Sequence, residues 1–120
     1  MNYLNIAVLG LALGSAGAFA NDCEAPQVPT LPDGASSSMD DMLTGQKAVK
    51  TFQAANLEYM SCVDEQIKAA EKAAGEEPTP EAMETVGALQ EQYNAAVSQE
   101  EELAGQFNTE IREYKAANPQ

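Results

Sequence analysis

The stretch Gly75-Glu76-Glu77-Pro78-Thr79-Pro80 separates two long amphipathic segments and decides the predicted fold. Gly75 suits the position just after a helix, because glycine adopts positive φ without a steric cost. Thr79 is a suitable N-cap, and Pro80 fits the first position of a following helix. Helices joined by so short a connection are usually antiparallel neighbours. The chain is therefore predicted to be all-α, a long antiparallel helical hairpin with its turn at residues 75–80.

The first predicted helix covers residues 38–74. Either Ser37 with Asp40 or Ser38 with Asp41 has capping-box spacing at its start, with Asp in place of the usual Glu. Apolar residues then recur at steps of three and four and define one face, as amphipathic helices require. They are Met39, Met42, Val49, Phe52, Tyr59, Met60, Val63, Ile67, Ala70 and Ala74, and the face is interrupted at Gln46 and Asn56.

The second predicted helix covers residues 81–118. Its apolar face comprises Met83, Val86, Leu89, Tyr93, Val97, Leu103, Phe107, Ile111 and Tyr114. Gly87 and Gly105 weaken this helix by about 1 kcal/mol each relative to alanine; the alternative interpretation is that they allow the neighbouring chain to approach closely. At about 1.5 Å per residue, each helix should be roughly 55 Å long.

Residues 1–20 have the pattern of a signal peptide. An apolar run from Leu4 to Leu13 is followed by Ala18-Phe19-Ala20, which matches the A-x-A cleavage pattern, although Met1-Asn2-Tyr3 contains no Lys or Arg. The run is too short to span a bilayer. We expect cleavage after Ala20 and a mature protein in the periplasm or the medium; the alternative is an uncleaved amphiphilic anchor.

Residues 21–37 are predicted to form an extended arm. It contains Cys23-Glu24-Ala25-Pro26-Gln27-Val28-Pro29-Thr30-Leu31-Pro32-Asp33-Gly34, with a proline at every third position. Polyproline II has three residues per turn, so the prolines share one face, while Val28 and Leu31 lie on another and are expected to cover the groove between the helices. Asp33-Gly34 is expected to reverse the chain by positive φ at the glycine.

Cys23 and Cys62 are predicted to form one structural disulfide, as paired cysteines in exported proteins usually do. The extended arm spans roughly 46 Å and Cys62 lies roughly 36 Å along the first helix, so the arm reaches it only by running back along that helix. Closing a loop of this size contributes about 4 kcal/mol in the chain-entropy model.

The pattern Cys23-x-x-Pro26-x-x-Pro29-x-x-Pro32-Asp33-Gly34, followed by Met42, Val49-Lys50-x-Phe52 and Tyr59-Met60-x-Cys62-Val63, resembles a group of small exported proteobacterial proteins of unknown function. The resemblance covers about Cys23 to Val63. It implies an envelope location and pairing of Cys23 with Cys62, and it implies no chemistry.

The net charge of the chain limits the classes of molecule that it can bind. It has 19 acidic and 6 basic residues and a net charge of −13. Such a surface repels nucleic acid and anionic lipid, so we expect neither as a partner, and no stable membrane insertion after cleavage.

No catalytic, cofactor or metal site is expected. The chain has no histidine, and its serines lie in no nucleophile motif. Candidate calcium clusters are Asp40-Asp41, Glu76-Glu77 and Glu100-Glu101-Glu102, but adjacent acids on a helix point in different directions, so solvated faces are the simpler interpretation.

Two functional hypotheses remain. In the first, the protein is a non-enzymatic exported helical module that binds another protein or itself, or has a structural role. In the second, it is a small periplasmic binding or holdase-type protein that uses an apolar groove. A hydrophobic dye distinguishes them, because an open groove binds the dye in the folded state.

Overall fold

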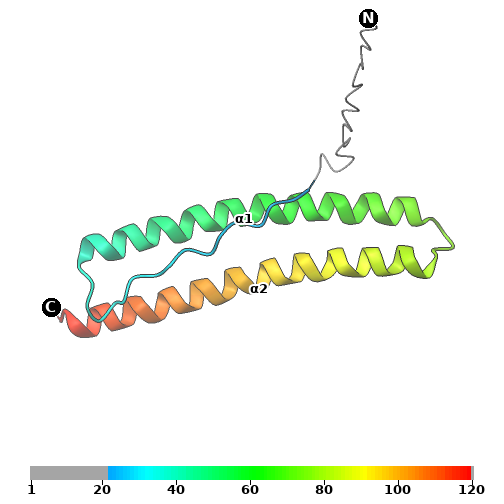
Figure 1. Cartoon of the computed structure of the whole chain (residues 1–120). Coiled ribbons are helices and arrows are strands. Elements are labelled where there is room, and N and C mark those ends of the chain that lie inside the picture. The colour runs from blue at the N-terminus through cyan, green and yellow to red at the C-terminus, as the bar shows by residue number, and fades with distance from the viewer. Residues whose placement is uncertain (1–21, 120) are drawn as a thin grey trace, which may run out of the picture.

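The computed structural model describes residues 22–119 and contains, over that range, two helices and no strand (Figure 1). Helix α1 is Met39–Ala74 and helix α2 is Pro80–Ala117. They run antiparallel, so the all-α hairpin is confirmed. The predicted bounds differ by one residue, because Ser38 and Asn118 are caps and Pro80 is already helical. The signal peptide predicted at 1–20 lies outside the described residues.

The helix ends form as their local sequences predict. Of the two capping-box registers, the structure has the second: the Ser38 hydroxyl accepts a hydrogen bond from the Asp41 N–H (3.1 Å), and the Asp41 carboxylate accepts one from the Ser38 N–H (3.0 Å). The Ser38 backbone, and then its side chain, lower the pKa of Asp41. Thr79 accepts from the Ala82 N–H (3.1 Å), and Gly75 has φ +70°. These contacts explain why both helices begin where they do.

The core occupies only one half of the hairpin. Its buried apolar side chains are Met42, Val49, Phe52, Met60, Val63, Ala96, Leu103 and Phe107. Between residues 64 and 95, no residue is buried. Met39 and Met83, both placed on the predicted buried faces, are instead 52% and 59% exposed. The half next to the turn therefore consists of two helices without a third layer over their groove.

Asn56, a polar residue that interrupts the apolar face of the first helix, belongs to the core. Its residue exposure is 1%, and its Nδ2 donates a hydrogen bond to the backbone carbonyl of Ala96 on α2 (3.0 Å). A buried amide is tolerated because it is hydrogen-bonded. The small Ala96 side chain leaves room for this direct contact between a side chain and the facing backbone.

In chain order, the N-terminal arm, residues 22–37, runs along α1 from the middle of the hairpin to its open end, antiparallel to α1 (Figure 1). Every third residue from Cys23 to Pro32 is half-buried, while Val28 is 45% exposed. The expectation that Val28 covers the groove is therefore wrong, whereas Leu31 does pack against the core. With three residues per turn, the proline face and Cys23 turn inward together.

Gly34 is needed for a close approach and not for positive φ. Within residues 22–119, Gly75 alone has positive φ. A Cβ at Gly34 would overlap the backbone of Glu110 and lie 2.9 Å from the backbone nitrogen of Tyr114. The chain reverses through a turn closed by the Ser36 N–H and the Asp33 carbonyl (3.1 Å). The arm therefore docks directly on the backbone of α2.

The helical glycines have other roles than predicted. A Cβ at Gly87 or Gly105 would meet nothing within 4 Å, so the interpretation of these two as close-approach sites is wrong. The close approach occurs at Gly45 on α1, where a Cβ would lie 2.7 Å from the Pro32 ring and 3.3 Å from Phe107. The absence of a side chain at Gly45 thus allows Pro32, the last proline of the arm, to pack directly against α1.

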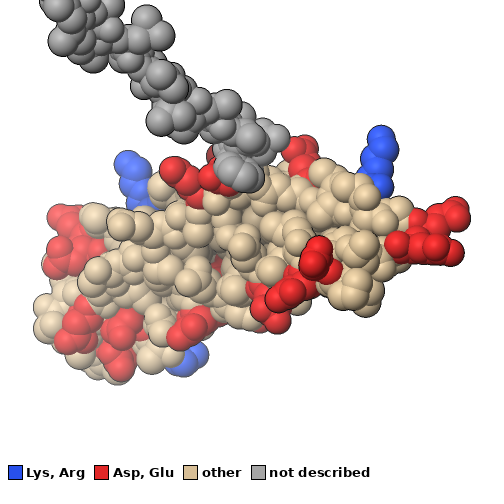
Figure 2. Space-filling model, turned by 45° about the vertical axis from the view of Figure 1, so that its right-hand side comes forward, with Lys and Arg blue, Asp and Glu red and all other residues tan. Residues whose placement is uncertain are grey.

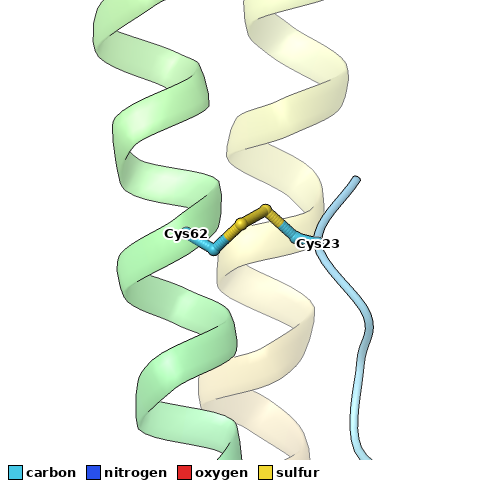
Figure 3. The surroundings of a disulfide bond; sticks show 2 residues. All are labelled: Cys23 and Cys62. Carbon is cyan, nitrogen blue, oxygen red and sulfur yellow. A yellow bond between two sulfur atoms is a disulfide. The ribbon is translucent and has the colours of Figure 1, made fainter. Parts of the chain in front are cut away.

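The disulfide predicted between Cys23 and Cys62 links the arm to α1, with their Cα atoms 5.8 Å apart (Figure 3). It lies near the middle of the hairpin, at the end of the buried core. The arm is consequently held at both ends, by the disulfide at Cys23 and by the contact of Gly34 with α2.

Removing the disulfide should destabilise the protein. We expect the double change Cys23→Ser with Cys62→Ser to lower the free energy of unfolding by about 2–4 kcal/mol, because the unfolded chain regains its conformational freedom. Denaturant unfolding measures this loss. Reduced wild-type protein should lose the same amount, and an unchanged denaturation midpoint in either case would contradict the role of the disulfide.

Gly34→Ala tests the docking of the arm on α2. The added methyl overlaps the Glu110 backbone, so we expect a loss of about 2 kcal/mol or more. Gly105→Ala is the matched control: it adds the same methyl to open space inside a helix and should stabilise by about 0.5–1 kcal/mol. Thermal unfolding of both variants is the measurement, and opposite shifts are expected. A neutral Gly34→Ala would mean that the arm does not touch α2.

Candidate functional site

The strongest candidate for a binding site is an apolar groove at the open end of the hairpin, on the face that the arm leaves uncovered. Its volume is about 470 Å³. It is lined by Met39, Met42, Leu43, Gln46, Phe107, Ile111, Tyr114, Lys115 and Asn118. We refer to these nine residues as the open-end groove. Both helices contribute to it, so its walls exist only in the paired hairpin.

The floor and the rim of the open-end groove differ in character. Met42 and Phe107 are buried and form its floor as part of the core. Met39 and Leu43 are more than half exposed at the rim. Lys115 is the one charged residue in the lining. The site therefore combines an apolar interior with a single cation at one end.

A second candidate surface lies along the outer side of α1. We define the α1 stripe as Leu43, Lys50 and Leu57, which are spaced by seven residues and therefore share one side of the helix. Leu43 is 53% and Leu57 65% exposed. The arm shares hollows with Thr44, Ala48, Thr51 and Ala55, on a different side of α1. The α1 stripe is thus not covered by any part of the described chain.

Charge is distributed unevenly over the hairpin. Between Asp41 and Glu58, α1 carries Lys47 and Lys50 and no acidic residue. Between Lys72 and Arg112, every charged residue is acidic. On the face shown in Figure 2, carboxylates gather at both ends and along one edge, around a wide uncharged area. The middle of α1 is therefore the longest stretch of either helix that carries basic residues and no acidic one.

The carboxylates that the fold brings together are not those weighed in the sequence as candidate calcium clusters. Asp33, Glu110 and Glu113 bring carboxylate oxygens within 4.8 Å of one another. Glu110 also accepts a hydrogen bond from the Gly34 N–H (2.7 Å). Asp33 and Glu113 are exposed, and exposed acids alone do not make a cation site. Their proximity depends on the docked arm, which sequence spacing could not show.

The proximity of these carboxylates changes the pKa of Glu113. A hydrogen bond with Glu110, followed by the charges of Glu110 and Asp33, raises the pKa of Glu113 above its usual value. The carboxyl group holds its proton more readily in the folded protein because its ionised form would face two other carboxylates. The contact between the arm and α2 is thus weakened by repulsion near neutral pH.

Of the predicted site residues, Cys23 and Cys62 come together and act structurally. Neither α1 nor α2 is long and apolar enough to cross a membrane. The second functional hypothesis included an apolar groove, but its location at the open end of the hairpin was not predicted. The apolar spacing at both helix ends indicated only residues of its floor. Comparison with protein-family models, curated proteins and solved structures finds no match to this chain. The resemblance to a proteobacterial group stays a prediction.

Glu113→Gln should stabilise the protein near neutral pH. The folded protein binds this proton more tightly than the unfolded chain, so the wild type gains stability as pH falls through the raised pKa of Glu113 and loses it as pH rises. The variant lacks this charge. We therefore expect its thermal midpoint to exceed that of the wild type at about pH 7 and the difference to vanish near pH 4. Glu91→Gln, an exposed position on the same helix, is the control; an equal effect there would contradict the local cause.

Proposed function

We propose that the protein is a non-enzymatic, exported helical module that binds another protein in the periplasm or outside the cell. The observation that carries the proposal is the α1 stripe, an exposed apolar and basic line on a helix that is otherwise packed on two sides. The Cys23–Cys62 disulfide supports export, because disulfides persist in oxidising compartments. The A-x-A pattern at Ala18 to Ala20 supports cleavage before Asn21.

The partner that fits the α1 stripe is a helix with apolar residues at seven-residue spacing and acidic residues beside them. Leu43 and Leu57 would pack into such a helix, and Lys50 between them would pair with its acids. Lys47 adds a second cation at the edge of the stripe. The absence of acids between Asp41 and Glu58 reduces the local repulsion of an acidic helix, although the chain as a whole has a net charge of −13.

A second copy of the chain fits this surface less well. The large exposed apolar side chains of the described residues are Val28, Met39, Leu43, Leu57 and Met83. On α2, Met83 alone is of this kind, so a second copy could offer only its own α1. That arrangement places Lys50 against Lys50 when the helices are antiparallel, at the centre of the contact. We therefore propose a different protein as the partner and keep self-association as an outcome of the test.

The second candidate function is that of a small binding or holdase-type protein. The open-end groove favours it, because an uncovered apolar site of this size can accept a ligand or a client side chain. Because Leu43 belongs to both surfaces, a hydrophobic dye that binds the native protein, and that Leu43→Asp but not Leu57→Asp displaces, would support this candidate.

Photocrosslinking in cells tests the interaction. A photoreactive residue at position 57 should give a discrete adduct with another protein, and the same residue at position 99, exposed on α2, should not.

The intact mass of the protein purified from the periplasm should correspond to a chain that begins at Asn21. The purified partner should lose at least about tenfold in affinity with Lys50→Glu, a charge reversal in a packed contact, and keep it with Lys68→Glu, whose side chain pairs with Asp64 instead.

Two outcomes would contradict the proposed partner. An adduct of twice the mass of the protein would show self-association through the stripe. Equal adducts from positions 57 and 99 would show that the α1 stripe has no preference. Because Leu57 is exposed, replacing it leaves the core unchanged, so neither outcome can be attributed to unfolding.

A further inference from the structure

We propose that the open-end groove binds a free single-chain anionic amphiphile, with its hydrocarbon tail between the helices and its acidic head group at Lys115. This inference develops the second candidate function and does not depend on the α1 stripe. It is carried by the form of the groove, by the nature of its lining and by the position of its one charge.

The size and shape of the groove suit a small ligand. A volume of about 470 Å³ lies within the range of small-molecule sites. On α1 the lining extends from Met39 to Gln46, which is about two helical turns or roughly 11 Å. That length is short for a docked helix, whereas a single hydrocarbon chain fits between the two walls. The rim at Lys115 and Asn118 is open, so a polar head group can stay in water.

The walls are apolar and adaptable. Ile111 and Tyr114 pack against the core from α2, and Met39 and Met42 face them from α1. Methionine side chains are flexible and polarisable, so they adjust to tails of different length. Burying each methylene of a tail here contributes about 0.8 kcal/mol. The apolar interior therefore provides the affinity without a specific shape.

The charge of the lining selects the head group. The chain has 19 acidic and 6 basic residues, yet the nine groove residues include one lysine and no acid. Within residues 22–119, the ion pair that forms is Lys68 with Asp64, so Lys115 is available to an external anion. A carboxylate at Lys115 would gain a charge-assisted hydrogen bond. Asn118 lies in the same lining, but its Nδ2 already donates to the Tyr114 carbonyl (2.9 Å), so Lys115 is the residue that recognises the head group.

The same electrostatics favours a free amphiphile over a membrane. A net charge of −13 repels an anionic bilayer as a whole, because many lipid charges face many protein charges at once. A single carboxylate meets mainly its nearest cation. The groove also opens between two helices whose surroundings are acidic, which keeps an extended anionic surface at a distance.

Calorimetric titration with decanoate tests the proposal on the oxidised mature protein. We expect saturable binding with one site, and weaker or no binding of decyltrimethylammonium, which has the same tail and the opposite charge. Lys115→Gln should weaken decanoate binding about tenfold, the loss of one charge-assisted contact. Lys50→Gln is the matched control outside the groove and should leave binding unchanged.

A second pair of variants tests the tail. Leu43→Asp introduces a charge at the groove rim and should abolish decanoate binding, whereas Leu57→Asp, at a leucine that is even more exposed, should not. Both leucines are more than half exposed, so both variants should fold, and circular dichroism checks this. Since Leu57→Asp impairs the proposed protein contact and spares the groove, the two proposals can fail separately.

Three results would overturn the inference. Equal affinity for decanoate and decyltrimethylammonium would show that Lys115 does not select an anionic head group. Equal effects of Leu43→Asp and Leu57→Asp would place the tail elsewhere. Flotation with phosphatidylglycerol vesicles, as strong for the wild type as for Lys115→Gln, would indicate a membrane surface as the binding partner.

Discussion

The hairpin depends on the arm being held at both ends. At one end the disulfide joins Cys23 to α1, and at the other Gly34 lies against the backbone of α2 and donates a hydrogen bond to Glu110. Two helices alone bury one stripe each, and such a core is small for a chain of this length. The arm adds a third layer, and the buried residues are found only in the half of the hairpin that this layer covers.

This arrangement also determines which surfaces remain open. Because the prolines and Cys23 face inward, the arm occupies one side of α1 and leaves the α1 stripe free on another. It likewise closes the groove between the helices on one face only, so the open-end groove stays accessible on the other. The proposed protein contact and the proposed ligand site are therefore both consequences of an asymmetric third layer.

The contact between Gly34 and α2 is accompanied by unfavourable repulsion between nearby carboxylates. Docking the arm brings Asp33 beside Glu110 and Glu113, and the crowding raises the pKa of Glu113. The hydrogen bond from the Gly34 N–H to the Glu110 carboxylate acts in the opposite direction, because it attaches the arm to α2. The arm is consequently held by covalent and steric constraints more than by charge, which is consistent with a domain whose overall charge is strongly negative.

The sequence alone determined the local features. A helix start at Ser37 or Ser38, a second start at Thr79 and a stop at Gly75 follow from side chains that act within a few residues. The pairing of the two cysteines follows because the chain has only one pair of them. Only the tertiary structure decided that Asn56 is buried, that Gly34 and Gly45 are the close contacts, and that Val28 faces water. It also decided the open-end groove and the cluster of Asp33, Glu110 and Glu113. These features depend on the rotation of the arm and on the register between the helices. Both are set by packing between residues far apart in the chain, so the periodicity of each segment shows which residues share a face but not which residues they contact.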